Sequence, residues 1–261
     1  YDTADLYGNG RVEKMLGSIF LKKNDIKICT KYGNRYYKNK IYFDTSSEYF
    51  NFSLENSLKR LKREKIDFYL LHSPPSDFVI SNSLFNAINN AIKNGKILNF
   101  GISCRTVKDA LKFRNNYDFI KCVEINYNLI DNTADNKLFN KIEKEDLFII
   151  SRAPFVNGMI FKKNLIKKFS KNDFRKEYDL NTKSWIGDQL NKLKKNYTNF
   201  NIDTFALLFC LSNTKIDMVI PGMRSIDQIK RNIFIAKKQK LNQKTINYIK
   251  KQIPLTYQGW I

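Results

Sequence analysis

The chain has 261 residues, of which 43% are hydrophobic, and its 46 Lys and Arg against 25 Asp and Glu give a formal net charge of +21. This hydrophobic content excludes a disordered chain. No apolar stretch of about 18 residues is present, so we expect neither a membrane span nor a membrane partner. The basic residues are scattered and form no nucleic-acid motif, which favours a solvated basic surface over a nucleic-acid partner. Long-range attraction of an anionic cofactor or substrate is also consistent with this charge.

Short apolar segments alternate with amphipathic ones along the chain, which is typical of βα units with parallel strands. The predicted strands are Tyr1–Ala4, Ile26–Thr30, Phe68–His72, Ile97–Ser103, Cys122–Asn126, Leu147–Ser151 and Met218–Ile220. Predicted helices between them include Val12–Phe20, Tyr49–Arg63, Ser83–Asn94, Val107–Asn115 and Ala134–Lys144. No linker interrupts this order, and the length suits one α/β barrel of about 250 residues. We therefore assign residues 1–261 to a single domain.

Four ionisable residues lie at or just past the ends of predicted strands: Asp2, Tyr7, Lys31 and His72, the only histidine. Strand carboxyl ends in such a barrel converge on the face that carries the active site. There Lys31 would lower the pKa of Tyr7, so that the phenol can donate a proton. Asp2 would hold Lys31, and His72 would orient a carbonyl oxygen. Taken singly, Asp2 and Lys31 also fit a structural ion pair, and His72 a satisfied core histidine.

The motifs around these residues resemble the aldo-keto reductase family. They are Asp-Thr-Ala-x-x-Tyr-Gly from Asp2, Ile28–Lys31, Ile66–His72, Gly95–Ile97, Phe100–Ser103, Glu124–Leu129, Ala153–Pro154 with Gly158, and Ile220–Ser225. The resemblance implies a (β/α)8 TIM-type barrel that transfers hydride from NADPH to aldehydes and ketones, or back from an alcohol to NADP+. Asp2, Tyr7, Lys31 and His72 match the family's catalytic quartet without a substitution.

The resemblance also indicates what precedes the chain in a complete barrel. Seven strands are predicted where eight close the barrel, and the family's first strand and helix come before the strand that holds Asp2. The chain starts at Tyr1, without Met. We therefore expect a fragment that lacks its first strand and helix.

The segment after the last predicted strand has the features of a phosphate site. The free amides of a helix N-terminus attract phosphate, and the Arg224 guanidinium and Ser225 hydroxyl suit an adenosine 2′-phosphate. The resemblance implies ten cofactor-binding positions: Ser103, Glu124, Arg152, Pro154, Gly158, Gly222, Arg224, Ser225, Gln228 and Asn232. Arg231 stands where many members carry Glu. NADPH is favoured over NADH.

Several nicotinamide-end positions depart from the family pattern. Ser103 matches the serine that bonds the carboxamide, but Cys104 replaces a frequent Asn and Glu124 a frequent Gln. A carboxylate still accepts a hydrogen bond from the carboxamide. Arg152 falls near the position of a stacking aromatic ring, and a guanidinium can stack as well. Gly158 would let the backbone approach the pyrophosphate.

The long segment Met159–Asp203 resembles the loop that covers the cofactor in this family, although a surface insertion also fits. The substrate is not readable, because barrel specificity comes from variable loops. Candidates are Tyr32–Phe43, the segment after Pro75, and the tail Tyr257–Ile261.

The four single cysteines have no metal-site spacing, so we expect no metal and reduced thiols in a cytoplasmic protein. The first hypothesis is an NADPH-dependent carbonyl reductase acting on a small-molecule carbonyl substrate. The alternative is a cofactor-binding regulatory or redox-sensing subunit with little turnover. The sequence does not predict an oligomeric state.

Overall fold

The computed structural model describes residues 1–21, 23, 25–38, 40–142, 147–162, 165, 169–170, 173–196 and 201–253. The chain divides into two compact units. The first comprises Tyr1–Glu124 and Glu145–Phe148, and the second Ile125–Lys144 and Ile149–Ile261. The assignment of both to one domain stays a prediction.

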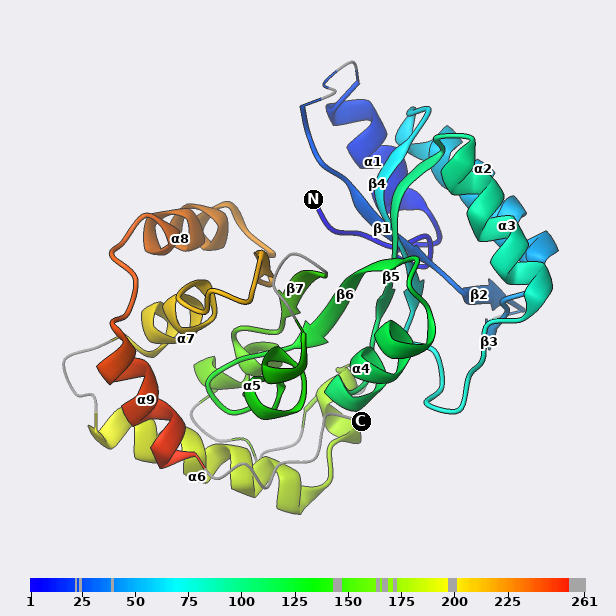
Figure 1. Ribbon diagram of the computed structural model, residues 1–261. Coiled ribbons are helices and arrows are strands. Elements are labelled where there is room, and N and C mark those ends of the chain that lie inside the picture. The colour runs from blue at the N-terminus through cyan, green and yellow to red at the C-terminus, as the bar shows by residue number, and fades with distance from the viewer. Residues whose placement is uncertain are drawn as a thin grey trace. The chain divides into compact units, whose positions relative to one another are not determined.

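Parallel strands form the centre of the first unit. In sheet order they are β1 (Cys29–Tyr32), β4 (Ile66–His72), β5 (Ile97–Ser103) and β6 (Ile120–Asn126), of which the last two residues of β6 belong to the second unit. Their helices are α1 (Arg11–Ile19), α2 (Ser47–Leu61), α3 (Asn82–Lys93) and α4 (Val107–Asn116). In Figure 1, α2 lies beside α3 along the strands, and it also packs on α1. These elements agree with the predicted βα order.

The apolar face predicted for α2 is buried: Leu54, Leu58 and Leu61 are 2%, 6% and 2% exposed. Its start is capped by Ser46, whose hydroxyl accepts from the Tyr49 amide. Such a cap satisfies an amide that has no partner within the helix. The spacing of the leucines and the cap therefore explain both the position and the orientation of this helix.

The predicted strand at Tyr1–Ala4 is wrong in extent. Only one isolated parallel bridge forms there, between Asp2 and Cys29. The Cys29 backbone exchanges two hydrogen bonds with Tyr1 and Thr3, of 2.8 and 2.9 Å. The Thr3 carbonyl then accepts from the Lys31 ammonium at 3.1 Å. This bond replaces the one that the Lys31 backbone amide would make in a regular ladder, although the Asp5 amide still donates to the Lys31 carbonyl at 3.1 Å.

A hairpin, which the sequence did not predict, follows β1. It consists of β2 (Asn34–Tyr37) and β3 (Lys40–Phe43), which pair antiparallel within the proposed specificity segment Tyr32–Phe43. Tyr36 and Tyr42 are about half exposed. The hairpin therefore lacks the alternation of apolar and polar residues that would have predicted its strands from the sequence. The side-chain amide of Asn34 donates to the backbone carbonyl of His72 at 2.9 Å. This hydrogen bond connects the hairpin to the end of β4.

The register of β5 against β6 shifts by one residue. Phe100 pairs with Ile120, but Gly101 pairs with Cys122, so Lys121 is the extra residue of a bulge. Beyond the bulge, Ser103 pairs with Glu124. Because strand side chains alternate between two faces, a one-residue slip exchanges the residues that face the site.

The second unit contains β7 (Phe148–Arg152), whose first residue belongs to the first unit, and β8 (Met218–Ile220), which pairs with β7 in parallel. Its longer helices are α6 (Leu180–Asn196), α7 (Ile202–Leu211), α8 (Ile226–Ala236) and α9 (Gln243–Gln252). α7 lies beside α8, and α6 beside α9 (Figure 1). No helix in the described part of the chain is long and apolar enough to cross a membrane.

The helix predicted over Ala134–Lys144 is too long. It is divided into α5 (Ala134–Lys137) and a 3-10 turn, η1 (Phe139–Lys141). Leu138 between them has φ −127 and ψ −57, and both Leu138 and Phe139 are buried. This backbone conformation at Leu138 lies outside the helical region and ends α5. Residues 143 and 144 lie outside the described residues.

Candidate active site

The ends of three neighbouring strands place predicted site residues in one row. His72 at the end of β4 pairs with Ser103 at the end of β5, and Ser103 pairs with Glu124 on β6. Residues in register on parallel strands project to the same face. The carboxyl ends of the strands therefore bring together residues that are far apart in the sequence.

Lys31 is the centre of this arrangement. Its ammonium donates to Asp2 Oδ1 at 2.5 Å and to the Thr3 carbonyl at 3.1 Å, and it lies 3.1 Å from Glu124 Oε2. The side chain is only 1% exposed. Three acceptors match the three hydrogens of an ammonium group. The predicted pair of Asp2 and Lys31 is present, with Glu124 as a second carboxylate.

Burial and charge act in opposite directions in this cluster. Burial alone would lower the pKa of Lys31, but the carboxylates of Glu124 and then Asp2 raise it well above its usual value. Burial, followed by repulsion from Glu124, raises the pKa of Asp2 to about 6, against the attraction of Lys31. Lys31 is therefore charged, and the Asp2 carboxyl can take up a proton near pH 6.

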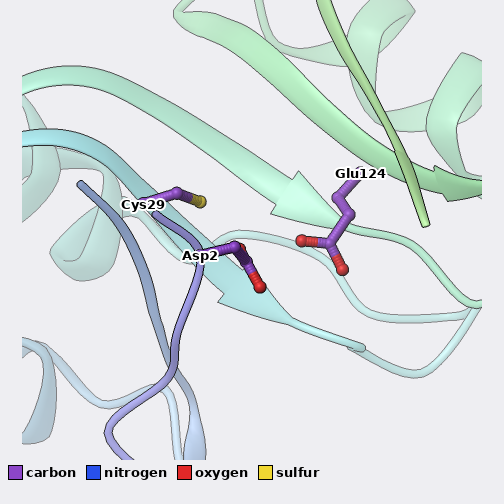
Figure 2. Close-up of side chains that lie close together, drawn as sticks. All are labelled: Asp2, Cys29 and Glu124. Atoms are coloured by element: carbon purple, nitrogen blue, oxygen red, sulfur yellow. The ribbon is translucent and has the colours of Figure 1, made fainter. Parts of the chain in front are cut away.

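Figure 2 shows the two carboxylates with the nearby thiol of Cys29. One ligand atom from each of Asp2, Cys29 and Glu124 lies within 4.8 Å of the others, and they are the only such group of three in the part of the chain that is described. The spacing suits a metal ion, but the Lys31 ammonium already contacts both carboxylates. Burial also raises the pKa of the Cys29 thiol well above its usual value. The carboxylates are therefore already paired with the Lys31 ammonium, and the thiol is held in its neutral form, which disfavours a metal ion at this position.

Tyr7 and His72 lie next to this cluster. Their ring centroids are 5.9 Å apart, with the planes at 82°, and the Lys31 ammonium lies 5.8 Å from the centroid of the Tyr7 ring. Tyr7 is 42% exposed, so solvent reaches its side chain. The structure thus brings together all four residues of the predicted quartet.

Ser103 and Glu124, predicted for the nicotinamide end, lie at the same cluster. The Ser103 hydroxyl donates to Glu124 Oε1 at 3.0 Å, and both residues are buried. The Cys104 amide donates to the Glu124 carbonyl at 2.8 Å. The Glu124 carboxylate therefore contacts both a predicted cofactor residue and the predicted catalytic lysine.

The second unit holds the other predicted cofactor residues. Beyond β7, Pro154 is buried, and Gly158 has φ +77 within the 3-10 segment η3 (Val156–Phe161). A Cβ atom at Gly158 would lie 3.3 Å from Arg175 Nη1. Arg152, also predicted, donates through Nε to Asn126 Oδ1 at 2.9 Å. Glycine allows both the left-handed backbone and the close approach of Arg175.

Sequence reasoning missed a group of cations in the long segment Met159–Asp203. The cationic groups of Lys162, Arg175 and Lys183 lie 5.9, 4.9 and 5.5 Å from the centroid of the Phe169 ring. An aromatic face attracts cations. Arg175 is also paired with Asp173 at 2.6 Å, so the group together with Asp173 has a charge of about +2, which attracts an anion. The run from Asn172 to Arg175 was the available signal, but Asn172 lies outside the described residues, as does the tail Tyr257–Ile261.

The start of α8 matches the predicted phosphate site in its local geometry. Ser225 is the N-cap, and its hydroxyl accepts from the Gln228 amide at 3.3 Å. The backbone amide of Arg224 donates to Gln228 Oε1 at 2.6 Å, which ties the Arg224 backbone to α8. The Arg224 side chain is exposed. Among the described residues, no atom lies within 4 Å of a Cβ built on Gly222. Open space and free helix amides suit an anion.

Asn232 supports a ligand at the same helix. It is 4% exposed, and neither atom of its amide has a hydrogen-bond partner among the described residues. Buried polar groups are nearly always paired, so this amide fits the polar edge of a bound molecule. Next to it, Arg231 pairs with Asp203 at 3.1 Å and covers the Phe161 ring at 5.0 Å. The residues present fit a phosphorylated dinucleotide.

A sequence profile of the Aldo/keto reductase family matches residues 1–253. The chain belongs to this family. An uncharacterized oxidoreductase of Bacillus subtilis is 26% identical over 251 residues, covering 94% of this chain and 80% of the relative. A probable voltage-gated potassium channel subunit beta of rice (Oryza sativa) is 23% identical over 253 residues, covering 89% and 76%.

Solved aldo-keto reductases show the same fold. The holo form of one from Bacillus halodurans has a TM-score of 0.80 at 25% identity, and the match covers 98% of this chain and 82% of that one. One from Klebsiella pneumoniae, solved in complex with NADPH, has a TM-score of 0.71 at 16% identity, covering 100% and 82%. The predicted α/β barrel class is therefore confirmed. The relatives of this chain thus include an aldo-keto reductase of Schizosaccharomyces pombe as well as the probable channel subunit of rice.

Proposed function

We propose that this aldo-keto reductase reduces an aldehyde or ketone to an alcohol with NADPH, and that Tyr7 donates the proton. The observation that carries the proposal is the grouping of Tyr7, His72 and the ion-paired Lys31 at the carboxyl ends of the strands. When bound, NADPH supplies the hydride for the carbonyl carbon.

Each group of the quartet has a physical task in this reaction. The Tyr7 hydroxyl gives its proton to the carbonyl oxygen, and the Lys31 ammonium stabilises the phenolate that remains. Lys31 can do this because it stays charged between its carboxylates. His72 lies edge-on to Tyr7 and donates a hydrogen bond to the same oxygen. Asp2 holds Lys31 in position, so it acts through the lysine.

Each predicted cofactor residue is assigned to one part of the dinucleotide. Ser103 and Glu124 serve the nicotinamide carboxamide, with Arg152 and Pro154 near the ring. Gly158, together with the cations around Phe169, serves the pyrophosphate, and Gly222, Arg224 and Ser225 serve the 2′-phosphate. Gln228 and Asn232 serve the adenine end, where the buried Asn232 amide offers both a donor and an acceptor. The NADPH complex of the Klebsiella pneumoniae protein supports this choice of cofactor.

A regulatory subunit with little turnover is the second candidate, because a relative is a probable potassium channel subunit. NADPH-dependent reduction of nitrobenzaldehyde by the purified chain separates the two functions. Steady turnover supports the reductase. NADPH binding without turnover of a panel of aldehydes and ketones would support the subunit instead.

The predicted cellular location rests on the thiols. All four cysteines are buried and none forms a disulfide, as expected for a reducing compartment. A cytoplasmic location stays a prediction.

A further inference from the structure

Helix α1 lies directly against the end of α2. A Cβ atom built on Gly17 of α1 would lie 2.3 Å from the carbonyl oxygen of Arg60, so only glycine permits this close approach. Lys14 and Ser18 are four residues apart and therefore project from the same side of α1. The crossing brings both of them beside the last turns of α2.

A pocket of about 390 Å³ opens beside this crossing, lined by Lys14, Ser18, Asn56, Lys59, Arg60 and Lys62. Asn56, Lys59 and Arg60 share one face of α2, because residues three and four apart are neighbours on a helix. Four of the six lining residues are basic and none is acidic. The volume is in the range of pockets that bind small molecules.

Three of the four cations in this pocket are not already paired. Arg60 forms an ion pair with the buried Glu13 at 2.6 Å. Lys14, Lys59 and Lys62 are exposed, and none of them forms an ion pair with a carboxylate in the part of the chain that the structure describes. The dipole of α2 stabilises cations at its C-terminus, which accounts for Lys59 and Lys62 but not for Lys14 on α1.

A second pocket, of about 500 Å³, shares Lys59 and Lys62 with the first. It also contains Glu55 and Glu64, and Glu55 pairs with Lys96. Lys96 directly precedes β5, so this region lies at the amino ends of the strands. The amino ends are roughly 20 Å from the carboxyl ends, because β4 and β5 have seven residues each. The first, wholly basic pocket is therefore distinct from the candidate active site.

Lys62 reaches both pockets from a strained backbone. It is the C-cap of α2, with φ 54 and ψ 46. This left-handed conformation favours glycine, which has no Cβ atom to clash there. Residues held in such conformations are found preferentially at functional sites. Lys62 thus supplies a positive charge at a position where glycine would suit the fold better.

We propose that the pocket between α1 and α2 binds a small phosphorylated molecule with at least two negative charges. Three ammonium groups, each with three donors, match the oxygens of several phosphoryl groups. The Ser18 hydroxyl and the Asn56 amide provide neutral donors beside them. A ligand held by residues of both helices would fix α1 against α2 and stabilise the folded chain. The inference is independent of the proposed function, because no residue of the pocket takes part in the proposed reaction or in cofactor binding.

The test is the binding of tripolyphosphate to the full chain, measured by calorimetry at low ionic strength because salt screens exposed charges. Lys62→Gly should weaken binding by about threefold or more, and the triple variant Lys14→Ala, Lys59→Ala, Lys62→Gly by at least about tenfold. Without ligand, Lys62→Gly should be at least as stable as the wild type in urea unfolding, because glycine relieves the left-handed backbone. Weaker binding would then not result from unfolding.

The matched control is Lys38→Gly. Lys38 is also exposed and has φ 46, but it lies between β2 and β3, so this change should leave the affinity within about twofold of the wild type. Equal affinity of the wild type and the triple variant, or an equal loss in Lys38→Gly, would overturn the inference, as would no binding by the wild type at millimolar tripolyphosphate. Loss of binding in Arg224→Ala but not in the triple variant would overturn it too, because the anion would then bind at the start of α8.

Discussion

A Cβ atom built on Gly101 would lie 2.2 Å from the carbonyl oxygen of Cys122. No side chain fits at that distance, so the bulge that aligns Ser103 with Glu124 requires glycine at this position. The geometry of the candidate site thus depends on a residue that has no functional group.

Gly101→Ala should lower the stability of the protein and displace the residues of the candidate site. The added methyl group must displace the Cys122 backbone, and overpacking of this kind costs about 1–3 kcal/mol. Chemical denaturation should show the loss, and cofactor affinity should fall with it. The control is Gly187→Ala on α6, where the nearest atom to the Cβ is 3.9 Å away and alanine favours the helix. Equal stability of the two variants would show that β5 and β6 accommodate the methyl group.

Tyr7→Phe should remove most of the carbonyl reduction and leave NADPH binding intact. The ring and its contact with His72 remain, and only the proton donor is lost. Loss of a positioned acid commonly lowers the rate by about 10²–10⁴-fold. Initial rates with nitrobenzaldehyde test this, with Tyr36→Phe on the exposed hairpin as the matched change. Reduction by the Tyr7 variant at the parental rate would remove Tyr7 from the mechanism.

Arg224→Ala should weaken NADPH binding far more than NADH binding. The exposed guanidinium beside the Ser225 cap is the proposed partner of the 2′-phosphate, which NADH lacks. A charge-assisted hydrogen bond of this kind contributes roughly 1.5–3 kcal/mol. Fluorescence titration with both cofactors measures the difference, and Lys230→Ala, on the same helix, controls for the loss of one surface charge. Equal losses for both cofactors would assign Arg224 to a shared part of the dinucleotide.

Asp5→Asn should make the pH dependence of stability smaller. Burial raises the pKa of Asp5 to about 6 from 3.8, while the Ser53 hydroxyl bond, the Glu13 charge and the Arg60 charge have smaller and partly opposing effects. The folded state therefore holds this proton more tightly than the unfolded state, and the contribution of Asp5 to stability falls as the pH rises from about 4 to 6. Asparagine has no such proton.

The stability of Asp5→Asn relative to wild type should therefore rise between pH 4 and pH 7, by up to about 3 kcal/mol. Urea unfolding at both pH values measures this difference. Asp188→Asn, at an exposed position of α6, is the control and should show no such change. A relative stability of the Asp5 variant that does not depend on pH would mean that the carboxyl is solvated in the folded state.

Local sequence patterns were sufficient for the order of the strands and for the bounds of two of them. β5 and β8 have the predicted bounds, and the apolar face of α2 is buried as expected. Lys31 and His72 lie in parallel strands that deliver their ends to one face, and Asp2 and Tyr7 reach it from the segment that pairs with Cys29. Strand bounds and the apolar face of a helix depend on neighbouring residues, so they can be predicted from the sequence.

Tertiary structure alone decided the partners of these groups. The ion pair between Lys31 and Glu124 joins residues 93 positions apart and depends on the bulge at Gly101. The cations around Phe169 likewise come together only through the folding of a long segment. Strand register and loop packing are set by contacts between distant residues, and a one-residue shift would turn a different side chain toward the site. That is why the sequence predicted candidate site residues, whereas the partners of these residues emerged only from the fold.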